Sequence, residues 1–418
     1  MVFVANRLKL VTYALSVGLL SVLALPEQAL AKKKPRDHSH LAFDADKRKK
    51  TKSSIGQRLS YSGSIGISRL DEHNLKLNDG VDDRSLQIIG TLSFAFKAQI
   101  SEKIRGFAHV ELSQTDKTTH RQNYGSYSRV KIKEAHLSFG LADKHTLSFG
   151  RMRFAEPRRW GMDASVDGIH LGWRDDKTAW EAALFRDAFE KRGAYAFVHA
   201  QRFSKKFAIG AYGLIESLEG KQRLHIAGYL ATLGKERGGY DLYAASVFGD
   251  AANGRSSGFA IDANLVSRFS GVRWKPQLIL GLAAGSPGYV QPDLNSNKAR
   301  DGGQAQFHRF GTVFQPDMSN LVVATAALGL RPSKTFSVDL RAHAYAQMQA
   351  SNFAPVARVQ GLTTGQSRHV GHEFSIVGAW RPNKKTKIEL SAGVFKPGNA
   401  YSDRSSVKRV YLRMTKYF

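Results

Sequence analysis

The chain has 418 residues and no Cys, and its 62 Lys and Arg against 35 Asp and Glu give a formal net charge of +27. A hydrophobic fraction of 42% with 10% aromatic residues excludes general disorder. The lack of Cys excludes disulfides, thiolate metal sites and thiol nucleophiles. The basic excess predicts a polyanionic partner, which is nucleic acid, an anionic membrane surface, or an acidic solute or polymer.

The N-terminus has the pattern of a secretory signal peptide. Arg7 and Lys9 precede an uncharged, mostly apolar run over 10–25, and a small-x-small cleavage pattern ends at Ala31. The run is shorter than the ~20 apolar residues that span a bilayer. We therefore predict a signal peptide over 1–31, whose removal leaves a net charge of 27 − 1 = +26. Export argues against a nucleic-acid partner.

Residues 32–54 form a separate, basic zone. The stretch 32–52 carries nine Lys and Arg against three Asp, which is typical of a solvated periplasmic tail or linker. Electrostatic attraction of a polyanion is the alternative role for this tail. His38 and His40 are too few to predict a metal site, and we predict no metal and no cofactor for the chain.

Residues 55–418 alternate between apolar and polar side chains, as strands of an outer-membrane β-barrel do. Over 336–347, Phe336, Val338 and Leu340 share one face, while Asp339 and Arg341 share the other. The pattern predicts eighteen strands, an even number, near 58–68, 86–99, 104–113, 129–140, 144–152, 166–174, 178–186, 194–203, 206–216, 223–233, 239–248, 256–267, 272–284, 320–331, 335–349, 369–381, 386–396 and 407–418. We therefore predict an all-β, monomeric transmembrane antiparallel barrel in the bacterial outer membrane.

The connections alternate in length. Those after even-numbered strands are short, whereas several after odd-numbered strands are long: 69–85, 114–128, 153–165, 285–319 and 350–368. Short turns are periplasmic and long loops extracellular in such barrels, so both termini are predicted in the periplasm. The loop 285–319 lacks a strand pattern, and loops this long are usually functional lids or disordered. If it folds over the mouth, small anions could pass it while a polymer would need it displaced. No periplasmic plug is expected, so gating falls to the extracellular loops.

Two strand details carry further predictions. In 129–140, regular alternation would turn Lys131 and Lys133 toward lipid, at a cost of ~2–4 kcal/mol each at the midplane, so we expect a bulge or interfacial snorkelling. The terminal Phe418 resembles the signal that the barrel assembly machinery recognises, which makes that machinery and outer-membrane lipid predicted partners.

The polar faces are predicted to line a water-filled lumen. Basic side chains in a pore favour anions over cations. The candidates from strand alternation are Arg105, Arg202, Arg223, Asp339, Arg341 and Arg413. We also expect Asp to temper the Arg charges, with Arg341 beside Asp339 and Arg158 and Arg159 beside Asp163.

Two segments resemble the alginate export family. The first is LSFGRMRFAEPRRWGMDASVDGIHLGWR at 147–174, and the second is HEFSIVGAWRPNKKTKIELSAGVFKPGNAY at 372–401. The resemblance implies an eighteen-stranded barrel with an Arg-lined lumen that exports the polyuronate alginate. By motif position it implies a constriction or mouth built from Arg151, Arg153, Arg158, Arg159, Trp160 and Asp163. The family's usual Gln after Gly-Arg is Met152 here.

The physical chemistry agrees with a polyuronate substrate, because Arg binds carboxylates bidentately. The predicted function is an outer-membrane channel for an anionic exopolysaccharide, with possible periplasmic export partners. The alternative is an anion-selective porin for phosphate or small organic acids. Enzymatic activity is not predicted, because no nucleophile-elbow or zinc-protease motif is present in the sequence.

Overall fold

The structure is a computed structural model that describes residues 59–77, 83–119, 123–142, 144–189, 193–204, 206–232, 238–251 and 254–418. The predicted signal peptide and basic tail lie outside the described residues. Within the described ranges, no helix is long and apolar enough to cross a membrane.

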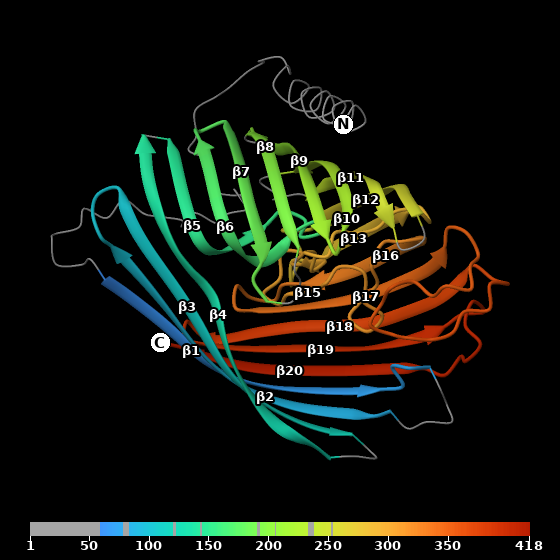
Figure 1. The fold of residues 1–418 in the computed structure, drawn as a ribbon. Coiled ribbons are helices and arrows are strands. Elements are labelled where there is room, and N and C mark those ends of the chain that lie inside the picture. Colours follow the sequence, from blue (N-terminus) through green and yellow to red (C-terminus); the bar gives the residue numbers. More distant parts are fainter. Residues whose placement is uncertain are drawn as a thin grey trace, which may run out of the picture.

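Eighteen strands form one antiparallel sheet, and β20 pairs with β1 to close it into a barrel (Figure 1). The wall strands are β1 (Leu59–His73), β2 (Ser85–Gln99), β3 (Ile104–Thr119), β4 (Asn123–Ala142), β5 (His145–Ala155), β6 (Asp163–Arg174), β7 (Thr178–Asp187), β8 (Ala194–Phe203), β9 (Phe207–Leu218), β10 (Lys221–Thr232), β11 (Gly238–Ala251), β12 (Gly254–Arg268), β13 (Gln277–Gly285), β16 (Leu321–Leu330), β17 (Phe336–Gln347), β18 (His369–Asn383), β19 (Thr386–Pro397) and β20 (Val407–Tyr417). Each wall strand corresponds to one predicted strand.

The main differences from the predicted boundaries lie at two connections. The predicted loop 114–128 is almost entirely strand, because β3 continues to Thr119 and β4 begins at Asn123. The predicted strand 272–284 begins only at Gln277, because the preceding turn holds Trp274 and Lys275 at positive φ, 66° and 44°. Elsewhere, the connections after even-numbered strands are short and several of those after odd-numbered strands are long, as predicted.

The pleat separates a lipid-facing surface from the interior, as the alternation predicted. On β17, Phe336 and Leu340 are 38% and 47% exposed on the outside of the barrel. Asp339 and Arg341 point inward and are buried. On β20 the same rule exposes Val410, Leu412 and Met414 and turns Arg409 and Arg413 inward.

The bulge expected in β4 is present. Glu134 pairs with His109 and Ile132 pairs with Val110, so Lys133 is the extra residue between them. The bulge resets the alternation, which leaves Ile132 exposed outward and turns both Lys131 and Lys133 into the barrel. Lys133 Nζ then lies 3.2 Å from Glu111 Oε1 of the neighbouring strand.

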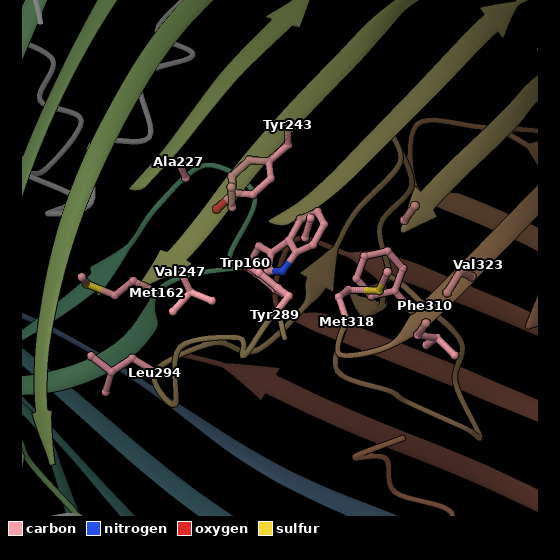
Figure 2. Packing of buried hydrophobic residues seen from close by; sticks show 14 of the residues in the cluster. Trp160, Met162, Ala227, Tyr243, Val247, Tyr289, Leu294, Phe310, Met318 and Val323 are labelled. Atoms are coloured by element: carbon pink, nitrogen blue, oxygen red, sulfur yellow. The ribbon is translucent and has the colours of Figure 1, made fainter. Parts of the chain in front are cut away.

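The loop between β13 and β16, residues 286–320, folds into the barrel and is called the plug here. It contains a two-stranded hairpin, β14 (Lys298–Ala299) with β15 (Phe307–His308), that the sequence pattern did not predict. A buried hydrophobic cluster joins plug residues to the inward faces of the wall strands. Figure 2 shows Tyr289, Phe310 and Met318 of the plug in this cluster, with Tyr243 and Val247 from the wall.

Candidate functional site: a plugged lumen with a basic cluster

The plug runs along the length of the lumen and does not simply fold over the mouth. It starts and ends at the long-loop ends of β13 and β16, yet the Nε2 of Gln304 donates to the carbonyl oxygen of Lys334 in a short turn at the opposite end. Near this tip, Arg341 Nη1 donates to Asp301 Oδ2 at 2.7 Å. The direction of the loop is set by these polar contacts with the wall, which periodicity does not reveal.

The predicted pairing of Arg341 with Asp339 is therefore wrong. Asp339 Oδ1 accepts from Arg331 Nη2 at 2.6 Å, while the guanidinium of Arg341 turns to the plug and lies 4.1 Å from the centre of the Phe307 ring. Both predicted residues do face the interior. Arg341 binds the plug tip, Asp339 binds Arg331, and both predicted residues are buried and do not line an open path.

A buried carboxylate on β18 anchors the other half of the plug. Glu373 is fully buried, and its oxygens accept from the backbone N–H groups of Thr312, Val313 and Phe314 at 2.5, 3.1 and 2.9 Å. Gly311, at a φ of 116°, allows the chain to wrap this closely around the carboxylate. The sequence analysis did not single out Glu373, because a lone acidic residue on an inward face has no distinctive pattern.

Replacing this anchor is expected to loosen the plug. Glu373→Gln replaces one carboxylate oxygen by an amide N–H₂, so at least one of the three backbone donors loses its acceptor, and losing a buried acceptor costs ~1–3 kcal/mol. We expect faster tryptic cleavage at Arg300 of the plug and more frequent channel opening. Glu181→Gln is the control, because that buried carboxylate bonds the wall residues His170 and His199. Equal protease resistance in wild type and Glu373→Gln would show that the anchor is unimportant.

The end of the β5–β6 hairpin, residues 151–167, also folds into the barrel and is called the inner hairpin here. Phe154 lies six residues along β5 from Ser148, the partner of His170. An extended strand would separate Phe154 from His170 by ~20 Å, yet their ring centres are 5.3 Å apart. The hairpin therefore bends back over the inner wall, and Gly150, at a φ of 113°, lies at the bend.

The connection at the end of the inner hairpin is a packed core and not a mouth. Glu156 is buried and accepts from the backbone N–H groups of Arg158, Trp160 and Gly161. Burial raises the pKa of this carboxyl, and those N–H groups oppose the shift. Trp160 is fully buried and stacks on Tyr243 with ring centres 4.6 Å apart (Figure 2).

Two motif-derived candidates, Arg158 and Trp160, are thus structural. Arg158 is 5% exposed and donates to Asp262 of the wall, not to Asp163 as predicted. Its neighbour Arg159 does lie near Asp163, with Nη1 3.5 Å from Oδ2. The Nε2 of Gln291 donates to the carbonyl oxygen of Trp160 at 2.7 Å, so the plug and the inner hairpin are bonded together.

The opposite face of the inner hairpin carries Arg151 and Arg153, which alternate with the buried Met152 and Phe154. Arg151 binds Asp167 bidentately, with both bonds at 2.7 Å. The guanidinium of Arg151 and the amine of Lys131 lie 5.0 and 5.2 Å from the centre of the same Phe189 ring. Because Lys131 points inward from β4, Arg151 faces the lumen beside it.

Lys298 of the plug completes this group. Burial lowers the pKa of its amine, and the nearby cations Arg153, Arg159 and Lys133 lower it further, while Asp163 opposes them. The wall, the inner hairpin and the plug thus each contribute positive charge to one region. We name this region the basic cluster: Lys131, Lys133, Arg151, Arg153, Arg159 and Lys298.

The basic cluster borders the accessible side of the lumen. Inward side chains of β7–β18, such as Glu181 and Asp262, are buried by the plug and inner hairpin. Inward side chains of β2, β3 and β4, such as Ser93, His109 and Lys131, stay partly exposed. Arg105 on β3 and Arg413 on β20 also face inward and are partly exposed. We call this side, along β2–β4, the passage.

The two remaining candidates differ in placement. Arg223 on β10 faces inward as predicted and binds Glu216, with Nη1 3.3 Å from Oε2. Arg202 does not face inward, because the inward residues of β8 are Tyr195, Phe197, His199 and Gln201. Arg202 lies on the opposite face of β8, which also carries Ala196 and Ala200.

The plug contains a histidine that predicts a pH response. Burial and the cations Arg309, Arg409 and Lys298 lower the pKa of His308 to about 3. A docked plug therefore holds neutral His308, whereas a released plug regains a pKa near 6.5. Docking stability contributed by His308 is present above pH 6.5 and is lost as the pH falls toward 3.

We therefore expect channel opening to rise as the pH is lowered from 7 to 5, above the range where most carboxylates titrate. Single-channel recordings across this range measure the effect. His308→Gln should flatten the dependence whatever its effect on opening at pH 7. An unchanged slope in the variant would assign the response to another group.

The arrangement can bind and guide anions, and nothing in it indicates a metal centre. Within the described part of the chain, no three His, Cys, Asp or Glu side chains are placed to hold a metal ion.

A closed barrel of eighteen antiparallel strands with an apolar outer surface defines an outer-membrane channel protein. The family model "Alginate export" matches residues 209–414, nearly half of the chain, which is consistent with an outer-membrane protein of that family. This range contains the second of the two resembling segments, 372–401. No curated protein matches the chain in sequence.

Solved outer-membrane structures share the fold. OccAB4 of Acinetobacter baumannii is 11% identical with a TM-score of 0.59, covering 87% of this chain and 100% of that one. OccK5 (OpdH) of Pseudomonas aeruginosa is 7% identical with a TM-score of 0.60, covering 86% and 98%. OpdK of Pseudomonas aeruginosa, solved with vanillate, is 11% identical with a TM-score of 0.57, covering 86% and 98%. These likenesses show the barrel fold. Together with the match to the alginate export family model, this fold indicates a bacterial outer-membrane location.

Proposed function

We propose that this channel passes an anionic polysaccharide, an alginate-like polyuronate, from the periplasm to the outside. The observation that carries the proposal is the basic cluster, in which β4, the inner hairpin and the plug place six cations beside the passage. The match to the alginate export family supports a uronic-acid polymer as the anion.

The acidic side chains that bind the basic cluster favour transport of an anionic substrate over its tight binding. Asp163, Asp167 and Glu111 bind Arg153, Arg151 and Lys133, so the cations are held in place and partly neutralised. A carboxylate of the substrate can compete for a guanidinium without meeting the full field of six charges. Each site is then strong enough to admit a uronate and weak enough to release it.

An anion-selective porin for phosphate or small organic acids is the second candidate. The observation in its favour is that the plug and the inner hairpin cover the inward faces of β7–β18 and leave the accessible side along β2–β4. A small anion can use such a passage with the plug in place, whereas a polymer needs more room. Both candidate functions require anion selectivity. The porin works with the plug in place, whereas the polysaccharide channel requires the plug to make more room.

Reversal potentials in a planar bilayer under a salt gradient test the shared part. The purified full-length protein should favour chloride over potassium, because the mobile ions pass the basic cluster. A preference for potassium would refute both candidates.

A further inference from the structure

The outer surface of the barrel carries a row of basic side chains at one place on its circumference. β18, β19, β20, β1 and β2 are consecutive in the wall (Figure 1). At their long-loop ends the strand register places His372 opposite Lys396, and Lys408 opposite His73. Arg84 lies one residue beyond the pair Glu72–Ser85, and so next to His73.

These side chains point away from the lumen. Lys396, Lys408 and His73 are exposed, and the side chain of Arg84 is 58% exposed. They alternate with inward residues on their strands, such as the buried Phe395 and Glu72. Arg69, 60% exposed, extends the row one step toward the middle of β1. We call Arg69, His73, Arg84, His372, Lys396 and Lys408 the outer basic row.

A single acid accompanies the row in the described strands. Asp71 lies 3.1 Å from Arg84 and 3.7 Å from Arg69, so one carboxylate serves two guanidinium groups. Directly below, toward the membrane centre, the same strands expose Phe374, Val394, Val410 and Ile67. Positive charge thus lies at the long-loop end of an apolar outer surface.

Several other strands differ at this end of the barrel. At the long-loop ends of β9, β10, β11, β16 and β17, the corresponding outward residues are Ser217, Gln222, Asp250, Val322 and Ala346. β7 exposes a single basic residue there, Arg186. The outer basic row is therefore a concentration of positive charge on adjacent strands. In the outer membrane, the leaflet at this end contains phosphorylated, multiply acylated glycolipid.

We propose that the outer basic row is a binding site for the phosphorylated disaccharide headgroup of an outer-leaflet glycolipid, whose acyl chains pack on the apolar strands beneath it. Lys and Arg ammonium and guanidinium groups bind phosphate through charge-assisted hydrogen bonds. The adjacent apolar surface distinguishes a lipid from free phosphate. The site lies outside the barrel and is independent of what passes through the lumen.

The test uses the full-length protein in phosphatidylcholine nanodiscs, titrated with diphosphoryl lipid A and followed by native mass spectrometry. Lys396→Gln with Lys408→Gln should weaken binding roughly tenfold or more, because each basic residue near an anionic surface contributes substantially. The matched control is Lys385→Gln with Lys416→Gln, which removes equal charge from the short-turn end of β19 and β20. Unchanged heat-modifiable mobility on gels verifies that both variants fold.

Two further arms separate the sources of affinity. Fully dephosphorylated lipid A should bind equally weakly to wild type and to the Lys396→Gln, Lys408→Gln variant. Inorganic phosphate at matched concentration should not compete with diphosphoryl lipid A for the wild-type protein. Equal loss of binding in the control variant, or equal binding of phosphorylated and dephosphorylated lipid A, would overturn the proposal.

Discussion

Deleting residues 290–315 of the plug should raise single-channel conductance several-fold and lower ion selectivity. The segment fills the lumen between the wall and the passage, and no wall strand is removed. The deletion leaves residues 286–289 and 316–320, which suffice to join two adjacent strands. Conductance in planar bilayers measures the result, and heat-modifiable gel mobility verifies that the barrel is closed.

Replacing the same residues with a Gly- and Ser-rich segment of equal length is the informative control. This variant keeps the chain but loses the bonds from Glu373 and Arg341 to the plug. It should also conduct more than wild type, with noisier current, if specific anchoring closes the lumen. Wild-type conductance in both variants would show that the plug does not restrict the passage.

Replacing Arg151 and Arg153 with Ser should remove most of the anion preference. The change deletes two cations from the basic cluster and leaves Asp163 and Asp167 without those partners. A charge ~10 Å from a passing ion contributes about 1 kcal/mol at intermediate dielectric, or roughly fivefold in ion occupancy. The reversal potential under a salt gradient should shift strongly toward the cation value.

Lys384→Ser with Lys385→Ser removes the same charge from the turn between β18 and β19, far from the cluster, and should shift the reversal potential little. Equal shifts in the two double variants would mean that overall charge, and not the basic cluster, sets selectivity.

The wall of this barrel could be predicted from the sequence because alternation is imposed by the pleat. Phe336 and Leu340 against Asp339 and Arg341 form a pattern of period two, which many of the wall strands repeat. Even the bulge at Lys133 followed from the cost of turning two Lys toward lipid. These features depend only on neighbours along one strand.

The interior could not be predicted in the same way, because it depends on contacts between distant residues. The plug has no periodicity, and its direction follows from bonds such as Glu373 to Thr312 and Arg341 to Asp301. Likewise, the bend of the inner hairpin brings Phe154 against His170, which alternation cannot anticipate. The motif resemblance placed Arg151 and Arg153 in the lumen, yet gave the same role to Arg158, whose side chain is buried against Asp262.

Block of the anion current by added anions tests the proposed function most directly. Oligomers of mannuronate or guluronate and inorganic phosphate are added from the periplasmic side at matched total charge. The oligomers should block at much lower concentration than phosphate, because several carboxylates on one chain meet several cations of the basic cluster at once. If phosphate blocks as well as the oligomers do, polymer export is contradicted and the small-anion porin is favoured.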